Sequence, residues 1–404
     1  MSSIQSCCPG LRPLAVLETH PVQYHAPVFR AVHALGVPVV TVYGSDFSVA
    51  GYTDREFGAK FAWDTDLLAG YESRFLTRSA AGGAARYEDV RADGVGRALA
   101  KIHPAAVLLL GYSSRFDKGA IRAVLQAGYP LLFRGETTDH AQERSFLKSL
   151  LRDQLLRCFY ARCRRLLYLG RHSLAHFRRL GVPDRKLVYS PYCVETSSFQ
   201  ADEAARIELR DATRLELDVR PDQLMLLFSG KLVRRKGVDL LAAAVRKLPP
   251  GLAQQVVLVF LGDGEMREEL ARAAACEPAV PIRFLGFQNQ TRLSQFYQAA
   301  DLLVLPSRQS ETWGLVVNEA LHHGLPCVVS DRVGSAPDLV KPGETGEVFH
   351  ADNSNSLASA ILRAAGLVGS PEVRHRCRLI AGEHSVAAAA AGVAAAYRSV
   401  VIHP

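Results

Sequence analysis

The sequence of 404 residues lacks the marks of an exported or membrane-embedded protein. Its first thirteen residues have neither the basic start nor the continuous apolar stretch of a signal peptide. The aliphatic run Val256–Leu261 is too short to cross a bilayer, and the alanine-rich tract Val386–Ala396 is also too short and too weakly apolar. We therefore expect a cytoplasmic protein without a transmembrane segment.

Cysteine is scarce, with eight residues in a chain of this length. Without a secretory signal, such usage favours reduced thiols over a disulfide framework. Cys158 and Cys163 suggest a metal pair, but no second Cys or His pair follows at the spacing of a zinc site. We expect these cysteines to pack as small apolar residues.

A Walker phosphate-binding loop is also missing, because Met225 stands where its first glycine is needed and Leu232 replaces its Ser or Thr.

Positive charge is in excess over the whole chain, and it is unevenly distributed. Residues 1–200 contain 26 Lys and Arg against 17 Asp and Glu, and residues 201–404 contain 22 against 23. A basic first half attracts nucleic acid, a membrane surface or a phosphorylated small molecule. Composition alone does not choose among these.

What the sequence does contain is a regular alternation of short apolar runs and helical patterns. This rhythm predicts βαβ units, and the length exceeds what one core usually serves. We predict an α/β fold of two doubly wound, Rossmann-like domains that face a cleft. The expected strands are Leu14–Leu17, Val37–Tyr43, Ala106–Leu110, Pro130–Phe133, Arg165–Leu169 and Lys186–Val188, then Leu224–Phe228, Val256–Leu261, Ile282–Leu285, Leu302–Leu305, Cys327–Val329 and Gly346–Val348.

The domain boundary is expected near Ser197–Ala204, before a charged helix that begins near Asp202. This gives an N-terminal domain over residues 1–200 and a C-terminal domain over 201–385. A C-terminal helix over 386–404 is expected to pack back on the first domain. Open α/β sheets bind ligands at the carboxyl ends of their strands, so polar residues that follow strands are the functional candidates.

The most informative segment is Asp301–Ser330. An apolar strand enters a polar loop, and a helix begins near Trp313–Gly314 and ends at Gly324 and Pro326. The free amides of Gly314–Val316 would form the positive end of that helix, which is an anion site. We expect a diphosphate there.

Two carboxylates, Glu311 and Glu319, would flank this anion, with Glu319 roughly 7–8 Å beyond Gly314 along the helix. A diphosphate repels carboxylates, so their expected use is to accept hydrogen bonds from hydroxyls, of a sugar at one end and a ribose at the other. The alternative is that Glu311 caps the helix and Glu319 is a solvated helical residue.

Positive charge for the same site is expected from the turn after Leu224–Phe228. Gly230 lets the backbone approach a ligand, and Lys231 and Lys236 supply cations for phosphate oxygens. The alternative is a basic solvated turn. Two further loops lie at this edge, at Gly262–Gly264 and at Gly286-Phe287, where backbone groups could bind a nucleobase or simply form turns.

Together these segments resemble the retaining glycosyltransferases of family 4, which have the two-domain fold called GT-B. The matching residues are Gly230-Lys231-Leu232, Lys236-Gly237, Gly262-Asp263-Gly264, Phe284-Leu285-Gly286, Ala300-Asp301 and the E-x7-E pair Glu311 and Glu319. The resemblance implies that Glu311 holds donor-sugar hydroxyls, Glu319 the nucleotide ribose, and the two lysines the diphosphate. It also implies donor contacts from Gly286, Phe287, Thr312, Trp313, Gly314, Leu315 and Val316. Lys231 departs from the family's usual Arg, which loses the bidentate fork but keeps the charge.

The segment Thr19–Arg30, THPVQYHAPVFR, resembles the opening loop of a subgroup that serves surface-polysaccharide or natural-product assembly. His20, Gln23 and His25 should face the cleft on the acceptor side; the alternative is a helix entry with a buried His. Arg134 and Glu136 stand where the broader family often has a His–Asp pair. We expect them to contact acceptor or donor, or else to be salt-bridged structural residues.

Residues Glu143–Arg165 hold seven basic and two acidic residues among regularly spaced leucines and aromatics. This pattern predicts a basic amphipathic helix. Such a helix can lie on an anionic membrane, or its apolar face can complete the domain core. Nucleic acid is not an expected partner, because the aromatics fall on the packing stripe and no recognised binding module is present.

We expect transfer of a sugar from a nucleotide diphosphate donor, UDP-linked, to an unknown hydroxyl acceptor with retention at the anomeric carbon. Glu311, Lys236, Lys231, His25 and Glu136 are the candidate catalytic residues. Lysines and helix amides would stabilise the leaving diphosphate, so neither a metal nor another cofactor is expected. Two alternatives remain open: a sugar-nucleotide epimerase and a non-catalytic sugar-nucleotide-binding subunit.

Overall fold

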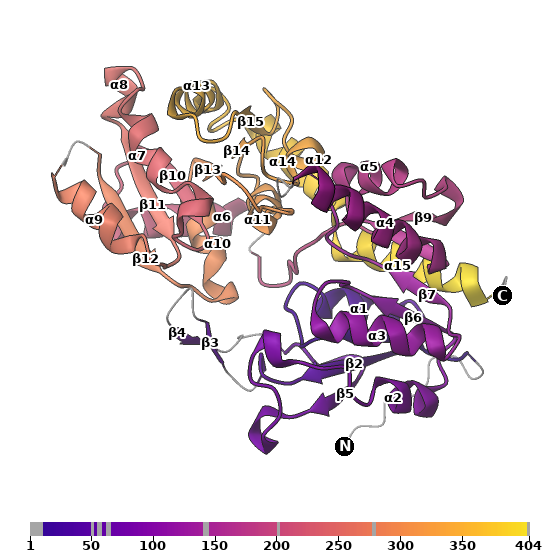
Figure 1. The fold of residues 1–404 in the computed structure, drawn as a ribbon. Helices are drawn as coiled ribbons and strands as arrows, with labels where there is room; N and C mark the ends of the chain where they lie inside the picture. Colours follow the sequence, from indigo (N-terminus) through magenta and orange to yellow (C-terminus); the bar gives the residue numbers. More distant parts are fainter. Residues whose placement is uncertain are drawn as a thin grey trace.

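The computed structural model describes residues 11–49, 52–54, 59–61, 66–139, 145–199, 203–276 and 280–401. Two parallel β-sheets with flanking helices form the two ends of the molecule (Figure 1). The first sheet is built from the N-terminal half of the chain and the second from the C-terminal half. The predicted class of two doubly wound α/β domains is confirmed.

The N-terminal sheet has seven strands in the order β5-β2-β1-β6-β7-β8-β9. In chain order their bounds are Leu14–Glu18 (β1), Val39–Ser45 (β2), Glu72–Thr77 (β5), Ala106–Leu109 (β6), Leu131–Phe133 (β7), Arg165–Tyr168 (β8) and Leu187–Tyr189 (β9). The prediction of six strands misses β5, because this edge strand reads ESRFLT and is half-exposed rather than apolar. It also misses a short antiparallel hairpin of β3 (Tyr52–Asp54) and β4 (Ala59–Phe61).

The C-terminal sheet has six strands in the order β12-β11-β10-β13-β14-β15. Their bounds are Leu224–Ser229 (β10), Val256–Leu261 (β11), Ile282–Gly286 (β12), Leu302–Leu305 (β13), Cys327–Ser330 (β14) and Gly346–Phe349 (β15). All six were predicted. Most are continuous apolar runs buried along their whole length, as expected for a parallel sheet covered on both faces.

Helices connect the strands of both sheets (Figure 1). Those of the first half are α1 (Ala26–Ala34), α2 (Val95–Ile102), α3 (Arg115–Gln126), α4 (Phe146–Arg162) and α5 (Arg171–Arg179), with 3-10 turns η1 (Ser79–Ala81), η2 (Tyr87–Asp89) and η3 (Asp184–Lys186). Those of the second half are α6 (Glu203–Glu216), η4 (Arg234–Lys236), α7 (Asp239–Val245), α8 (Pro250–Ala253), α9 (Arg267–Cys276), α10 (Gln290–Ala299), α11 (Leu315–His322), α12 (Ala336–Leu339), α13 (Ser354–Ala365), α14 (Pro371–Glu383) and α15 (Val386–Val401).

Helix α15 packs on the N-terminal domain, although it comes late in the sequence. Its buried residues Ala390, Val393 and Tyr397 join the core formed by β1, β6 and α1. The Ser190 hydroxyl donates a hydrogen bond to the Ala389 carbonyl at 2.9 Å. In Figure 1 this yellow helix lies among the purple helices of the first domain.

The segment Pro371–Val401, which spans α14 and α15, is long and apolar enough to cross a membrane, with a mean hydropathy of 1.4 over its most apolar window. Of that window 44% is buried inside the protein. The contacts of α15 with α1 and β9 bury part of this segment against the N-terminal domain.

In both sheets the chain order reverses beside the first strand, between β1 and β6 and between β10 and β13. Ligands of open α/β sheets bind outside the carboxyl ends of the strands at such points. The residues predicted to be functional lie at or after the carboxyl ends of β1, β7, β10, β12 and β13. The topology therefore brings them to the edges where a ligand is expected.

Candidate donor and acceptor site

The loop between β13 and α11 holds the first carboxylate. Glu311 is 9% exposed, and it follows Ser310, whose φ of 58° is uncommon outside glycine and indicates a strained loop. Gly314, with φ 91°, caps α11, and the half-buried Leu315 and Val316 begin the helix as predicted. The first amides of a helix have no partner inside it, so a positively polarised end lies beside Glu311.

Lys236 contacts Glu311 directly. Its Nζ donates a hydrogen bond to Glu311 Oε2, and Ser307 Oγ donates to the same oxygen at 2.8 Å. The two charged side chains are only 14% and 11% exposed. Gly237 follows with φ 68°, and a Cβ there would lie 2.1 Å from the Pro306 carbonyl oxygen. A residue without a side chain is thus needed for the two loops to meet.

The turns after β10, β11 and β12 lie side by side. A Cβ on Gly262 would lie 2.0 Å from the Gly230 carbonyl oxygen, so these two turns pack backbone against backbone. Lys231 follows Gly230 and is half-buried. Gly286 forms a β-bridge with Gly262, and the half-buried Phe287 comes next. The structure therefore gathers the predicted donor-binding turns at one sheet edge.

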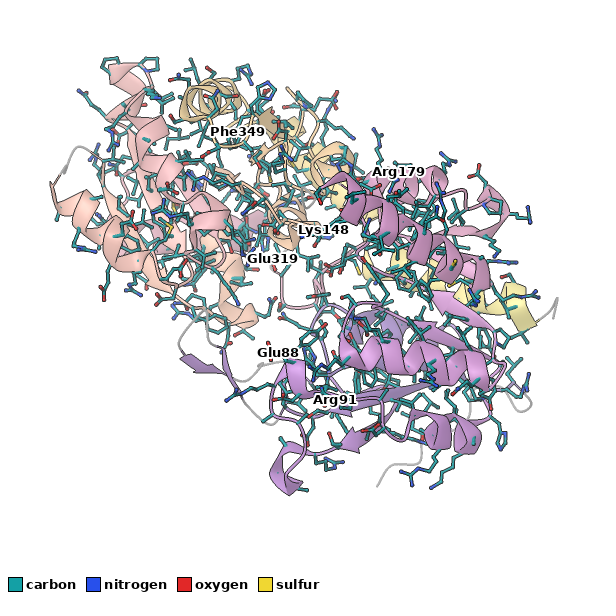
Figure 2. All side chains as sticks on the ribbon, in the orientation of Figure 1. Glu88, Arg91, Lys148, Arg179, Glu319 and Phe349 are labelled. Atoms are coloured by element: carbon teal, nitrogen blue, oxygen red, sulfur yellow. The ribbon has the colours of Figure 1, made fainter. Side chains whose placement is uncertain are left out.

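Glu319 lies on α11 and is 8% exposed (Figure 2). Its Oε2 accepts a hydrogen bond from the Tyr297 hydroxyl at 2.5 Å. Burial raises the pKa of Glu319 to about 7, although the hydrogen bond from Tyr297 opposes that rise. This environment contradicts the alternative of a solvated helical residue. Its ribose contact stays a prediction.

The residues after Glu311 connect the two domains. Thr312 Oγ1 donates to Glu136 Oε2 of the first domain at 2.8 Å. The Trp313 indole Nε1 donates to Asn318 Oδ1 at 2.7 Å, and its ring packs against Tyr192 at a centroid distance of 5.7 Å. The indole thus joins the domains, so a donor contact of Trp313 would come from its backbone.

His25 precedes α1 and is buried, which is the alternative considered for the opening loop. Its Nδ1 lies 2.5 Å from Glu18 Oε1. Burial raises the pKa of Glu18 and lowers that of His25 to about 3, so the charged form of each side chain is disfavoured here. Glu18 was not among the predicted site residues. Its signal is a carboxylate that directly follows the predicted apolar strand Leu14–Leu17.

His20 and Gln23 lie in the same loop but differ in surroundings. His20 Nδ1 is hydrogen-bonded to Thr19 Oγ1 at 2.9 Å, and burial lowers the pKa of His20 to about 4. Gln23 lines a cavity of about 290 Å³ whose wall includes Gln290 of the C-terminal domain. Gln23 is therefore the member of this group that the structure places between the domains.

Arg134 and Glu136 lie in different surroundings and contact different partners. Arg134 is buried, and its Nε and Nη2 donate to Ser190 Oγ at 2.9 Å and to the Pro191 carbonyl at 2.6 Å. These contacts fix the backbone that leads out of β9 and favour a structural role, without the predicted salt bridge. Glu136 is exposed and reaches Thr312 instead.

Among the described residues, no group of three or more His, Cys, Asp or Glu side chains is arranged to hold a metal ion. One Asp-x-Asp sequence occurs at residues 64–66, where residues 64 and 65 lie outside the described part. Asp66 Oδ1 accepts hydrogen bonds from the Leu68 and Ala69 amides. Of the proposed cysteine pair, Cys163 is buried in the core and Cys158 is exposed.

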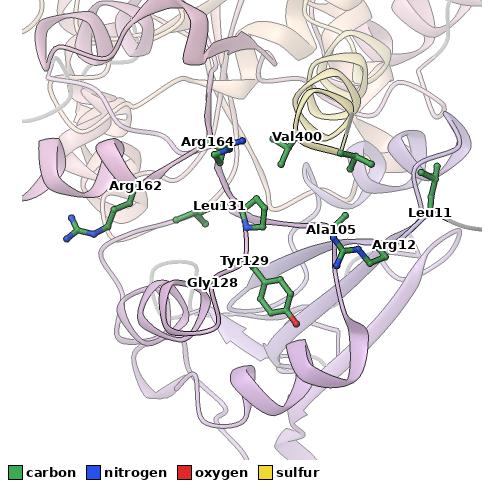
Figure 3. A pocket seen from close by; sticks show the side chains of 11 residues that line it. Leu11, Arg12, Ala105, Gly128, Tyr129, Leu131, Arg162, Arg164 and Val400 are labelled. Atoms are coloured by element: carbon green, nitrogen blue, oxygen red, sulfur yellow. The ribbon is translucent and has the colours of Figure 1, made fainter. Parts of the chain in front are cut away.

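A cavity of about 490 Å³ lies at the other edge of the N-terminal sheet (Figure 3). Its walls include Arg12, Ala105, Tyr129 and Arg164, which precede β1, β6, β7 and β8, and Val400 of α15. The candidate residues follow strands of this sheet. The cavity thus lies at the amino ends of the strands, whereas the candidate site lies at their carboxyl ends.

Comparison with known sequences finds a family match in the second half of the chain. Residues 210–379 match the family model described as glycosyl transferases group 1. The sulfoquinovosyl transferase SQD2 of Arabidopsis thaliana is 32% identical over 154 residues, 38% of this chain and 28% of that protein. A GDP-mannose-dependent alpha-(1-6)-phosphatidylinositol monomannoside mannosyltransferase of Mycobacterium tuberculosis is 31% identical over 204 residues, 48% of this chain and 50% of that protein. The chain spans half or less of these relatives.

Solved structures resemble the whole chain. The Anabaena protein HepE in complex with UDP has a TM-score of 0.68 and 17% identity, covering 96% of this chain and 100% of its own. The same protein has been solved with UDP-glucose. At this identity the likeness shows the fold, which is the predicted GT-B arrangement. Membership of family 4 and of the opening-loop subgroup stays a prediction.

Proposed function

We propose that this chain is a retaining glycosyltransferase of family 4 that moves a sugar from a UDP-linked donor to a hydroxyl acceptor. The group 1 match and the likeness to a protein solved with UDP and UDP-glucose support a nucleotide-sugar donor. The observation that carries the proposal is the contact of Lys236 with Glu311 beside the amino end of α11. A cation, a carboxylate and free amides are the groups that a diphosphate with a sugar on one side needs.

In this proposal the donor divides the site into three parts. The diphosphate lies on the α11 amides with Lys231 and Lys236 beside it, the sugar hydroxyls bind Glu311, and the ribose binds Glu319. When the sugar leaves, negative charge grows on the diphosphate. In this proposal the lysines and amides lie beside that charge and stabilise it electrostatically. The same charge neutralisation removes the need for a metal ion.

The transfer step needs no dedicated protein base. The bond from the anomeric carbon to the diphosphate oxygen breaks, and the bond to the acceptor oxygen forms on the same face of the sugar. The acceptor proton passes to an oxygen of the leaving diphosphate. In this proposal Glu136, which accepts a hydrogen bond from Thr312 of the donor loop, orients the acceptor hydroxyl.

The acceptor is proposed to be a polysaccharide, a glycolipid or a natural-product glycoside. The name of the mycobacterial relative includes a phosphatidylinositol monomannoside, which supports testing lipid-linked acceptors first. The basic excess of residues 1–200 supports an acceptor that contains phosphate or lies at an anionic surface.

The test is a mass-spectrometric screen of nucleotide sugars for protein-dependent donor consumption, followed by two variants. Glu311→Gln and Lys236→Ala are each expected to lower kcat by about 10²–10³-fold, since each removes a group aimed at the transition state. Matched controls are Glu344→Gln and Lys247→Ala, which change exposed groups of the same chemistry in the same domain.

Unchanged transfer in both site variants would sink the site assignment. Epimerised donor formed without any acceptor would replace transfer with an epimerase activity. Nucleotide binding without donor turnover, across acceptors that include lipid-linked ones, would instead indicate a non-catalytic binding subunit.

A further inference from the structure

Helix α4 exposes an apolar stripe to solvent. Leu147, Leu150, Leu151 and Leu155 are 75%, 50%, 66% and 65% exposed. Their spacing of three and four residues places them on one face of the helix. Exposed leucines are common singly, but four on one face form a continuous patch of the kind that marks an interaction surface.

The opposite face of α4 completes the domain core without these leucines. Leu156 and Tyr160 are 2% and 1% exposed and pack in the N-terminal core. Arg152 also faces inward, where its Nη1 lies 3.2 Å from Asp139 Oδ1. The core interpretation of this helix therefore holds for one face only, and the outward leucines have no packing role within the domain.

Cations border the leucine stripe. Lys148 and Arg157 lie on its two flanks, and Arg162 lies at its carboxyl end. The single acidic residue within Phe146–Arg162, Asp153, faces the other way and pairs with Arg179 of α5. Figure 2 places Lys148 at the end of α4 nearer the C-terminal domain and Arg179 on α5. The outward face is therefore apolar and basic, with no acidic side chain among its described residues.

We propose that the outward face of α4 docks the protein on an anionic lipid bilayer. The leucines enter the boundary between headgroups and acyl chains, and the three cations pair with anionic headgroups, as in other interfacial helices. The excess of 26 Lys and Arg over 17 Asp and Glu in residues 1–200 adds attraction. This property is independent of the proposed transfer reaction and rests on the helix alone.

A second copy of the chain fits this face less well than a bilayer. In a two-fold symmetric dimer the same patch meets itself, so the cations Lys148, Arg157 and Arg162 of one copy would approach those of the other. Like charges at an interface oppose association, whereas anionic lipid neutralises them. Charge complementarity thus favours lipid.

The test is flotation of the full chain with vesicles of phosphatidylcholine alone or mixed with phosphatidylglycerol. The wild-type chain is expected to bind the mixed vesicles and to lose most binding in high salt. The double variant Leu151→Ser with Leu155→Ser should weaken binding by about tenfold or more per leucine, because each substitution removes an apolar side chain that the bilayer would bury. The double variant Lys148→Ala with Arg157→Ala should lose more binding to the mixed vesicles than to vesicles of phosphatidylcholine alone.

The matched control is Leu215→Ser with Leu379→Ser, which removes two leucines that are 83% and 57% exposed on the C-terminal domain. This variant should bind as the wild type does. All four positions are on the surface, and equal melting temperatures would establish that the variants fold. Absence of wild-type binding to the mixed vesicles, or equal binding by the Leu151/Leu155 variant, would overturn the proposal. The proposal would also be overturned if sedimentation velocity without lipid showed a dimer in the wild type and the control but not in the Leu151/Leu155 variant.

Discussion

At the residue scale, the site is made of ionisable groups whose surroundings set their charge. Lys236 pairs with Glu311, His25 contacts Glu18, and Glu319 is buried against Tyr297. These contacts hold each group in place before a ligand arrives. They also couple protonation to folding, because a buried carboxyl resists ionisation.

Glu319→Gln should change how stability depends on pH. The folded pKa of Glu319, about 7, lies above the ordinary value of 4.5. Between these values the folded protein keeps a proton that the unfolded chain has released, so stability from this group is present at low pH and is lost as the pH rises through the folded pKa. From pH 5.5 to 7.5 the loss is about 2 kcal/mol. Urea denaturation at both pH values should show that the free energy of unfolding falls by about 2 kcal/mol more in the wild type than in the variant.

The control is Glu347→Gln at the same two pH values, since Glu347 is a buried carboxylate of the same domain that pairs with Arg363. Its variant should keep the wild-type difference between the two pH values. An equal pH dependence in the wild type and Glu319→Gln would contradict a raised pKa at this position.

Sequence patterns identify which residues gather at the site better than they identify what each side chain contacts. Lys236 and Glu311 were expected in one site and are hydrogen-bonded. Arg134 was expected to contact a substrate, yet it binds backbone carbonyls near the domain linker. The partners Ser190 and Pro191 are more than fifty residues away, so no local pattern could reveal them.

At the element scale, α15 is held close to β9 by a small residue. A Cβ on Gly392 would lie 2.0 Å from the Tyr189 carbonyl oxygen and 2.9 Å from Ser190 Cβ. No rotamer change relieves a contact with backbone. The approach of this helix to the sheet thus depends on glycine at position 392.

Gly392→Ala should destabilise the protein by about 1–3 kcal/mol, because the added methyl group forces α15 away from the sheet. Gly382→Ala is the matched control: it lies in the neighbouring helix α14, where nothing lies within 4 Å of an added Cβ. There alanine should raise stability by about 0.5–1 kcal/mol through its helix propensity. Thermal unfolding of both variants measures the difference, and equal midpoints would show that the contact can relax.

Elements with continuous apolar runs were predicted well, and half-exposed ones were not. β10 and β11 are buried along their whole length and were located to within one residue. The edge strand β5 was missed because its sequence mixes charge with apolar residues. For α4 the sequence indicates an amphipathic helix, but which leucines face the core depends on contacts distant in sequence.

At the scale of the whole molecule, the described domains meet through a few specific contacts. Thr312 bonds Glu136, and the Arg171 amide donates to Asp338 at 3.1 Å. The Asn318 side chain donates to the Tyr192 carbonyl at 3.4 Å. Fold and domain number followed from the sequence, because they depend on periodicity over many residues. The mutual placement of the domains did not, since it depends on contacts between residues that are distant in sequence.

The proposed charge neutralisation by lysines and amides predicts that metal removal leaves the whole reaction intact. UDP binding by calorimetry and donor consumption should be the same before and after treatment with EDTA. The reason is that the cations beside the diphosphate belong to the chain itself. Loss of either signal on chelation, with recovery on adding Mg²⁺ or Mn²⁺, would contradict the metal-free mechanism.

The return of α15 to the first domain orders events during synthesis. The N-terminal sheet is complete once β9 has been made, but the groove on its core remains open until α15 leaves the ribosome. At typical elongation rates of 5–20 residues per second, the intervening chain of about 200 residues takes roughly 10–40 s to produce. During that interval the nascent first domain displays apolar surface that is open to a chaperone until α15 packs on it.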